Sequence, residues 1–400
     1  MRPFASGIIC EGSRRRRDRP HSRRGVAGGL TFTRLPGEKE MDVSELGVGF
    51  IGCGRIMDLN ILGYLDRGDV RIAAFSDLDE ETLERRVEEY GQASTYLDYK
   101  DLLADPAVDI VEVLTPHFLH EQMVIEALEA GKHVSLQKPP AVTLEEMDHM
   151  IAASERSDRK LKVYENFVFY PPYLRAKQLI EAGEIGDPVG IRIKMNMSMA
   201  PTGWEVPLES WAWRIVQEMC GGGPCLFDDG YHKWSVAIDL LGGVEKVFAW
   251  IGAREMFPGT SIDAPAVVAW RYKGDRDLFG VCDEMMSADL HIASKYYAID
   301  ERMEVTGEKG VIWVTKWTAD MLGVPPVILY KDGKTTTYDD MPQDWADSFR
   351  DSTHHFIDAI ENDTEPVLTG ERGREVLMFS LAMMRSAHEN REVYISELEV

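Results

Sequence analysis

The stretch Gly131–Pro140, with sequence GKHVSLQKPP, decides how the rest of the chain is interpreted. Its apolar part, His133–Leu136, predicts a buried strand. Pro139 ends that strand because proline fixes φ and has no N–H to donate to a neighbouring strand. Lys138 is therefore expected at the carboxyl end of a strand, where open parallel sheets bind their ligands. Taken alone, Lys138 would be interpreted as a lysine on a solvated loop. The rest of the sequence must therefore show whether it belongs to a ligand-binding site.

Strands and helices alternate on both sides of this stretch. The predicted strands are Leu46–Ile51, Val70–Phe75, Val108–Leu114, His133–Leu136 and one that begins at Leu161. The predicted helices between them are Asp58–Arg67, Glu80–Tyr90, Tyr99–Ala104, Glu121–Ala130 and Thr143–Ser157. This alternation is typical of a parallel, doubly wound sheet. The sequence therefore predicts an α/β protein with an N-terminal Rossmann domain over residues 41–165.

A glycine-containing turn follows the first strand. Its sequence, GCGRIM from Gly52 to Met57, resembles Gly-x-Gly-x-x-Gly with methionine in the third glycine's place. Gly52 allows a tight turn, and Gly54 lets the backbone approach a pyrophosphate at a helix N-terminus. Asp77 ends the second strand, 23 residues after Gly54, near the offset of about 20 for an acid that binds the ribose 2′-hydroxyl. The context favours a dinucleotide site over a plain βα turn.

Asp77 also bears on the choice of cofactor. A carboxylate at this position would repel a 2′-phosphate, so NAD is expected and NADP is less favoured. Arg85 and Arg86 are expected on the solvated face of the next helix, where they would not offset this repulsion.

Length and composition limit the remaining possibilities. The 400 residues suggest two domains, and 44% of them are hydrophobic, enough for sizeable cores. No apolar run approaches the roughly 18 residues of a membrane span, and the net charge of −24 argues against nucleic-acid binding. The five cysteines show no spacing typical of a disulfide framework or a zinc site, so no metal is expected. Unpaired cysteines are typical of a reducing compartment, so a cytoplasmic location is expected. The five cysteines are Cys10, Cys53, Cys220, Cys225 and Cys282.

The first 40 residues differ from the rest. They hold ten lysines or arginines against four acids and show no periodicity, which predicts a disordered basic extension. A twin-arginine export signal at Ser22–Arg24 and a basic binding arm are two interpretations. We favour a third, translation from upstream of a native start at Met41, because folded patterning begins only after that residue.

The second half of the chain has a different pattern. After a helix from Tyr173 to Ala182, alternating apolar runs predict a largely antiparallel, open sheet with one covered face. These runs are Ile191–Met195, Val247–Ile251, Ala266–Tyr272, Leu278–Cys282, Glu304–Thr306 and Val311–Thr315. Two helices follow, Ser348–Asn362 and Glu375–Glu389. Residues 166–400 are therefore expected to form a C-terminal α+β domain.

Several motifs in this order resemble the glucose–fructose oxidoreductase / inositol dehydrogenase (Gfo/Idh/MocA) family of NAD(P)-dependent oxidoreductases. They are the glycine turn, the Thr115-Pro116-x-x-x-His120 segment, and Gln137-Lys138-Pro139 in place of Glu-Lys-Pro. His117 stands where relatives often carry asparagine, and Val168 where many carry arginine, which puts a substrate contact of that arginine in doubt. Relatives form dimers or tetramers through the free face of the second sheet, so a homodimer or homotetramer is expected.

The resemblance implies a set of cofactor-binding residues. The Thr115 segment would lie near the nicotinamide ribose, and Asn166 beside the nicotinamide and the substrate. The full set is Gly52, Gly54, Arg55, Ile56, Asp77, Thr115, Pro116, His120, Gln137, Lys138 and Asn166. For His120, the alternative is a histidine at a helix N-terminus that contacts no ligand.

A second chemical motif lies in the C-terminal domain. Asp228 and His232 are four residues apart, so on a helix they share one face, and they match the family's Asp-x-x-x-His pair. The alternative is a salt pair on a helix surface. Asp229 would point about 100° away from Asp228. The spacing from Gly221-Gly222-Gly223 is one residue longer than usual in relatives, so the loop is expected to differ.

These residues suggest a dehydrogenase that oxidises a secondary hydroxyl. His232 would take the hydroxyl proton, because an unperturbed imidazole titrates near neutrality. Asp228 would orient the imidazole or hold a neighbouring hydroxyl. Lys138 would donate to the reacting oxygen, or act as the base itself if burial lowers its pKa. The catalytic set is therefore Lys138, Asp228 and His232.

The substrate is expected to be a sugar, glycoside or cyclitol. Aromatic faces and an arginine suit a polyhydroxylated ring, and no basic cluster marks a phosphate. Tryptophans 204, 211 and 213 precede the glycine loop, although core packing explains any one of them equally well. The predicted substrate-binding residues are Phe169, Trp213, Arg214, Asp228 and His232.

Two other functions are compatible with the same residues. An NAD-dependent glycoside hydrolase would oxidise its substrate transiently, so NADH would not accumulate. A non-catalytic sensor would bind the nucleotide and a partner protein, but it would not need Lys138, Asp228 and His232 together.

Overall fold

The computed structural model describes residues 45–399, except residues 199, 201, 206, 208–210 and 258. The basic segment 1–40 lies outside the described residues. All elements below belong to one compact unit, Ser44–Val400.

The first sheet has six parallel strands in the order β3-β2-β1-β4-β5-β6. They are β1 (Leu46–Ile51), β2 (Val70–Ser76), β3 (Ser94–Tyr96), β4 (Ile110–Val113), β5 (His133–Gln137) and β6 (Leu161–Tyr164). The helices between them are α1 (Met57–Asn60), α2 (Leu62–Leu65), α3 (Glu80–Tyr90), α4 (Tyr99–Ala104), α5 (His120–Glu129) and α6 (Leu144–Ser157). This arrangement confirms the predicted Rossmann sheet, to which the unpredicted β3 adds a short edge strand.

Local sequence explains most of these boundaries. Asp79 caps α3, and Thr143 with Glu146 forms a capping box at the start of α6. The single helix predicted over Asp58–Arg67 is instead divided into α1 and α2. A Cβ atom on Gly63 of α2 would lie 2.5 Å from Cβ of Thr353, so this glycine permits the close approach of another helix.

The second sheet has nine strands in the order β16-β15-β14-β13-β7-β12-β11-β8-β17. They are β7 (Pro188–Ser198), β8 (Val244–Ile251), β11 (Ala266–Tyr272), β12 (Phe279–Ser287), β13 (Ile299–Gly307), β14 (Gly310–Val314), β15 (Val327–Lys331), β16 (Lys334–Tyr338) and β17 (Val393–Tyr394). Only the β7–β12 pair is parallel among these described strands, which confirms a largely antiparallel sheet. A separate two-stranded sheet contains β9 (Arg254–Phe257) and β10 (Thr260–Ile262).

The hairpin β15–β16 was not predicted, although the sequence marks it. Asp332 and Gly333 join the two strands, and both have positive φ, at 52° and 71°. An Asp-Gly pair between two strands is typical of a two-residue hairpin turn.

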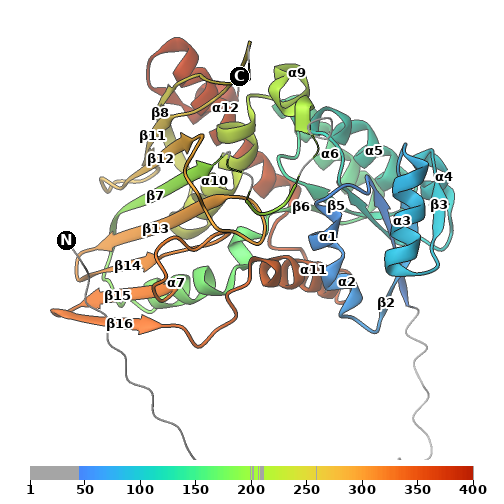
Figure 1. The fold of residues 1–400 in the computed structure, drawn as a ribbon, viewed down its shortest axis with the longest axis horizontal. Helices are drawn as coiled ribbons and strands as arrows, with labels where there is room; N and C mark the ends of the chain where they lie inside the picture. The colour runs from blue at the N-terminus through green and yellow to red at the C-terminus, as the bar shows by residue number, and fades with distance from the viewer. Residues whose placement is uncertain are drawn as a thin grey trace, which may run out of the picture. The chain divides into compact units, whose positions relative to one another are not determined.

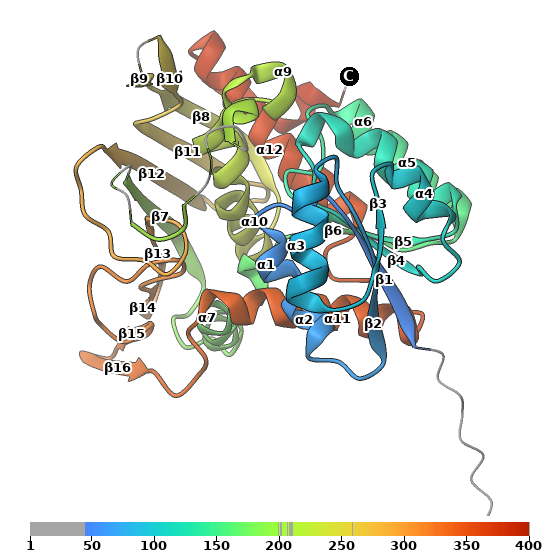
Figure 2. The ribbon, with the colours of Figure 1, turned by 45° about the vertical axis from the view of Figure 1, so that its right-hand side comes forward.

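Helices cover one face of the second sheet (Figures 1 and 2). They are α7 (Pro171–Glu181), which contacts β14 and β15, α10 (Gly230–Leu241), which contacts β7, and α12 (Gly370–Glu389), which contacts β8. Along β7, Ile191, Ile193 and Met195 are buried, whereas Arg192 and Lys194 are exposed. This alternation confirms that one face of the sheet is covered and the other is open.

Helix α11 (Trp345–Glu361) follows the second sheet in the chain but packs on the first (Figure 1). It contacts α1 and α2. Its Phe356 and Ile357 are fully buried in one cluster with Val48 and Phe50 of β1. The C-terminal part of the chain therefore completes the core of the Rossmann sheet. Among the described helices, none has the length and apolarity needed to cross a membrane.

Candidate active site

Four segments bring their side chains together at the carboxyl edge of the first sheet. Lys138 follows β5 and Glu165 follows β6. Asp228 is the second-last residue of a π-helical segment, Pro224–Asp229, which leads directly into α10 and His232. The Asp228 N–H donates to the carbonyl of Gly223 five residues earlier, at 3.1 Å. A π-helical turn holds one residue more than an α-helical turn, so it accommodates the extra residue that the sequence shows after the triple glycine.

Asp228 is surrounded by three basic side chains, of which His117 is neutral near pH 7 because burial lowers its pKa to about 3. Lys138 Nζ lies 2.8 Å from its Oδ1 and also donates to the Asp228 carbonyl at 2.9 Å. Arg214 Nε donates to Oδ2 at 2.5 Å. His117 Nε2 lies 3.7 Å from Oδ1. Although burial opposes ionisation, Lys138, Arg214 and His117 together hold the pKa of Asp228 well below its usual range. Asp228 is therefore an anion near neutral pH.

His232 does not depend on Asp228 for its orientation. Its Nδ1 lies 2.8 Å from both carboxylate oxygens of Glu165. The ring of Phe167 stacks on the imidazole, with centroids 4.1 Å apart and planes 10° apart. The structure therefore assigns to Glu165 the orienting contact that the sequence had offered to Asp228. The clue to Glu165 was its position directly after a buried strand, at the same sheet edge as Lys138.

The imidazole of His232 is also not an unperturbed one, as the sequence argument had assumed. Burial, followed by the ammonium groups of Lys138 and Lys233, lowers its pKa well below the usual value. Burial raises the pKa of Glu165 to about 8. The two side chains consequently have to be treated as one titrating unit.

The glycine turn is held from two sides. Asp77 Oδ2 accepts the Cys53 N–H at 2.8 Å. Arg86 donates from Nε to the Cys53 carbonyl at 3.0 Å and from Nη2 to the Gly54 carbonyl at 2.7 Å. Arg86 is only 3% exposed, so the prediction that it lies on a solvated face was wrong. Its Nη1 group binds two acidic side chains, so four of the five N–H groups of Arg86 have acceptors within the chain.

The same turn leaves space for a dinucleotide. Gly52 has φ +87°, a conformation that favours glycine. A Cβ atom on Gly54 would meet nothing within 4 Å, so the backbone there is open to a ligand. In the described structure, the N–H groups of Gly54, Arg55 and Ile56 have no acceptor. Free N–H groups at a helix start suit a pyrophosphate, so the residues present fit the predicted cofactor.

The other predicted cofactor residues lie close to this edge and contact the chain itself. His120 Nε2 and Nδ1 face the carbonyls of Thr115 and Pro140, at 2.8 and 3.1 Å. Gln137 accepts the Lys138 N–H through Oε1 at 2.9 Å. Asn166 is 2% exposed and donates to Ser348 Oγ at 2.8 Å. His120 thus joins two loops, and Asn166 anchors the turn after β6 to α11. Thr115 and Pro116 lie half-buried between β4 and His117.

The predicted substrate residues divide into two groups. Trp213 packs edge-on against His117, with ring centroids 4.7 Å apart, and Arg214 stacks on Trp213 at 4.4 Å. Both are thereby connected to Asp228. Phe169, in contrast, packs against His355 of α11, with ring centroids 5.5 Å apart. Trp204 stacks with Arg55 of the glycine turn at 5.2 Å, and so connects the predicted substrate loop to the cofactor turn.

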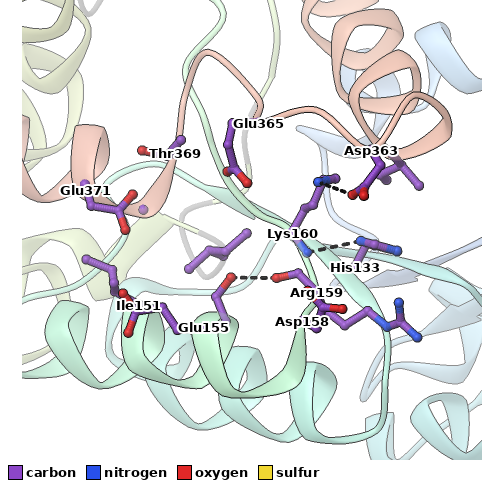
Figure 3. A pocket seen from close by; sticks show the side chains of 14 residues that line it. His133, Ile151, Glu155, Asp158, Arg159, Lys160, Asp363, Glu365, Thr369 and Glu371 are labelled. Atoms are coloured by element: carbon purple, nitrogen blue, oxygen red, sulfur yellow. Dashed lines mark hydrogen bonds and ion pairs between the residues drawn. The ribbon is translucent and has the colours of Figure 1, made fainter.

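A cavity of about 520 Å³ lies away from these residues (Figure 3). His133 and Lys160 line it, at the amino ends of β5 and β6. Lys160 Nζ pairs with Asp363 at 3.1 Å, and the Lys160 N–H donates to His133 Nδ1 at 3.1 Å. Because Lys138 and Glu165 follow the opposite ends of these strands, the cavity and the candidate site lie at opposite edges of the sheet. Within the described residues, no acid, histidine or cysteine cluster could hold a metal ion.

Comparison with known proteins agrees with this geometry. Residues 46–165 match the sequence model of an oxidoreductase family with an NAD-binding Rossmann fold, and residues 173–313 match that of the GFO/IDH/MocA C-terminal domain. A myo-inositol 2-dehydrogenase from Thermotoga maritima is 29% identical over 359 residues, which cover 88% of this chain and 99% of the relative.

Two further relatives are informative. A 1-carboxy-3-chloro-3,4-dihydroxycyclohexa-1,5-diene dehydrogenase from Comamonas testosteroni is 35% identical over 209 residues, 51% of this chain and 50% of the relative. A levoglucosan dehydrogenase, solved with NADH and levoglucosan, has the same fold, with a TM-score of 0.75 at 20% identity over 88% of this chain and 99% of that one. The two matched domains, in the predicted order, show that this chain is a CH–OH oxidoreductase of the Gfo/Idh/MocA family.

Proposed function

We propose that this protein is an NAD-dependent dehydrogenase that oxidises a secondary hydroxyl of a sugar, glycoside or cyclitol. One observation carries the proposal. A proton acceptor, His232, and a donor held by an anion, Lys138 with Asp228, lie together at the ligand-binding edge of an NAD-binding sheet.

Each of these groups has a part to play. Lys138 Nζ has three N–H groups, and two bonds to Asp228 leave one for the reacting oxygen, whose developing negative charge it would stabilise. His232 has no described partner at Nε2, so this nitrogen would accept the hydroxyl proton. The bound nicotinamide would supply the hydride acceptor.

Arg214 suits recognition of the rest of the substrate. Its Nε binds Asp228, whereas its two Nη groups have no hydrogen-bond partner among the described residues. A guanidinium with free N–H groups beside Trp213 can bind hydroxyl or carboxylate oxygens while the tryptophan face contacts a ring. Relatives act on myo-inositol and on a carboxylated cyclic diol, so both neutral polyols and their acids belong to the proposed class.

NAD is the proposed cofactor rather than NADP. Asp77 lies at the end of β2 with its carboxylate beside the glycine turn. Arg86 of α3, which holds the turn, already donates to two carbonyls and two acids. A 2′-phosphate would therefore face the Asp77 carboxylate, which would repel it.

We also propose a cytoplasmic homodimer or homotetramer that uses the open face of the nine-stranded sheet. Phe279 and Met285 of β12 and Trp250 of β8 are exposed on these strands, at 52%, 39% and 61%. Apolar side chains grouped on an open sheet are typical of a protein–protein interface. The described cysteines are buried and free, which suits a reducing compartment.

A substrate panel tests the proposed activity. The full chain would be incubated with NAD or NADP and with sugars, chromogenic glycosides, cyclitols and sugar acids, while NAD(P)H and released aglycone are both followed. NADH growth with one substrate group, and slower growth with NADP, is the expected result. Aglycone release without net NADH would instead identify the glycoside hydrolase. Tight NAD binding with neither product would identify the sensor.

A further inference from the structure

Glu165 contacts the proposed base, His232, although it is not among the site residues that the family resemblance predicted. It follows β6 in the crossover between the two sheets, and it is 1% exposed. Both of its oxygens lie 2.8 Å from His232 Nδ1, and its Oε1 also accepts the Phe167 N–H at 2.8 Å. The carboxylate is thus fixed to its own backbone, and the imidazole is fixed to the carboxylate.

The same turn also fixes the plane of the imidazole. Phe167, two residues after Glu165, stacks on His232. Trp317 stacks on Phe167, with centroids 5.6 Å apart. Asn166, which lies between Glu165 and Phe167 in the chain, donates a hydrogen bond to Ser348 of α11. The turn Glu165–Phe167 therefore forms a cradle that fixes both the tilt and the rotation of the ring, and leaves Nε2 as the nitrogen without a described partner.

We propose that Glu165 is the positioning residue of the base, and that Glu165 and His232 together hold the proton exchanged with the substrate; this inference rests on the proposed function. During oxidation, the proton of the reacting hydroxyl moves to Nε2 as the hydride leaves the carbon that bears this hydroxyl. The imidazole then carries protons on both nitrogens, and the one on Nδ1 is shared with the Glu165 carboxylate. During reduction, the Nε2 proton returns to the carbonyl oxygen.

A purely structural ion pair explains the geometry less well. Two buried charges are costly to desolvate, and such pairs contribute little net stability. The charged and titratable groups around the pair are Lys138, which follows β5, Lys233 and Tyr231 from α10, and Asp228 and Asp229 from the π-helical segment. With both lysines paired to acids, burial is the main influence on either partner, and it disfavours charge on both.

The direction of the pH dependence follows from the proton count. Burial raises the pKa of Glu165 to about 8. Below that pH the pair keeps its extra proton. If this proton is on Glu165, the carboxylic acid donates to Nδ1 and the single ring proton is on Nε2. If it is on His232, both Nδ1 and Nε2 carry a proton. Nε2 is therefore protonated in either case. Above that pH the carboxylate accepts from Nδ1–H and Nε2 is free. Oxidation should therefore rise as pH increases through about 8, and reduction should fall through the same region.

The test compares pH profiles of kcat in both directions for the full chain, Glu165→Gln and Glu165→Asp. Glutamine has nearly the same shape but cannot release a proton. We expect Glu165→Gln to lose the step near pH 8 and to lower kcat on the order of 10- to 100-fold, part of the 10²–10⁴-fold that general-base catalysis supplies. Glu165→Asp should restore the step with reduced kcat. Glu301→Gln, an equally buried carboxylate that binds Lys233 instead, should keep the step.

A second measurement does not depend on activity. The ¹⁵N NMR signals of the His232 ring, assigned by their loss in His232→Gln, report which nitrogen holds the proton. With NAD bound, we expect Nδ1–H above the transition, titration of Nε2 near pH 8, and loss of that titration in Glu165→Gln. Ring signals unaffected by Glu165→Gln, or an unchanged pH step, would overturn the inference. A chain that shows the expected ring titration but reduces no NAD would refute the proposed function and leave the pair intact.

Discussion

Asp228 and Asp229 are neighbours in the chain, yet each binds a different lysine. Asp228 binds Lys138 from the first sheet, at 2.8 Å, and Arg214. Asp229 binds Lys233 from its own helix, at 2.6 Å, and this lysine also binds Glu301 of β13 at 2.8 Å. Successive helical residues point about 100° apart, so one helix places the two acids in separate charge clusters.

The two clusters differ in what remains available to a ligand. The Lys138 side chain is 13% exposed and the Arg214 side chain 28%, and both have unused N–H groups among the described contacts. The Lys233 side chain is 2% exposed, as is that of Glu301, whose other oxygen accepts the Thr318 N–H. We infer that the Asp228 cluster serves the reaction, whereas the Asp229 cluster holds α10 on the second sheet.

The largest effect is expected from Lys233→Met, which should reduce stability. The change leaves Asp229 and Glu301 in a buried site without a cation. Breaking a buried ion pair in this way costs about 3–5 kcal/mol. Urea unfolding should show that loss, while kcat of the folded fraction changes only a few-fold. Unchanged stability together with lost activity would show that Lys233, and not only Lys138, serves the reaction.

Lys138→Met should have the opposite result. Asp228 keeps Arg214 as a partner, so the cluster is not left with an unpaired acid. The reacting oxygen loses a donor, and removal of one such donor typically lowers kcat about 10²–10³-fold. Steady-state kinetics should show this loss in kcat, and urea unfolding should show a smaller change than for Lys233→Met. Retention of most of the kcat would exclude Lys138 as the group that stabilises the reacting oxygen.

Much of the fold could be predicted because its signals are local. The strands of the first sheet are short apolar runs, and caps such as Asp79 and Thr143 mark where helices begin. Strand β3, with sequence STY, has no apolar pattern and is a strand only because it pairs with β2. The division of α1 from α2 coincides with the docking of α11, which comes from about 290 residues later in the chain.

Residues of the candidate site could be predicted only where residue type and local spacing together indicated a chemical role. Lys138 before two prolines, and Asp228 with His232 on one helix face, met that condition. Glu165 did not, because its partner lies 67 residues away and only the fold brings them together. Arg86 was placed on the wrong face because a pair of adjacent arginines on a helix usually lies in solvent. Four of its five N–H groups instead hold the glycine turn and the acids beside it.

The smallest effect is expected from Asp229→Asn, and it gives the sharpest comparison with Asp228→Asn. In Asp229→Asn, Lys233 keeps Glu301, so kcat should stay within a few-fold of the unchanged chain. In Asp228→Asn, Lys138 and Arg214 lose the anion between them and repel each other, and Lys138 keeps only a carbonyl. A tenfold to hundredfold loss in kcat, about 1.4–2.7 kcal/mol in the barrier, is expected there.

Both substitutions remove one negative charge from adjacent positions, so their effect on the overall field is nearly the same. A difference in kcat between them therefore measures which lysine each acid holds, and not the charge of the region. Equal losses of kcat would mean that the two clusters act as one unit. That result would contradict the structure, in which Lys138 binds Asp228 and Lys233 binds Asp229. The same pair, measured by urea unfolding, should show only modest losses for both, because each lysine retains at least one oxygen acceptor.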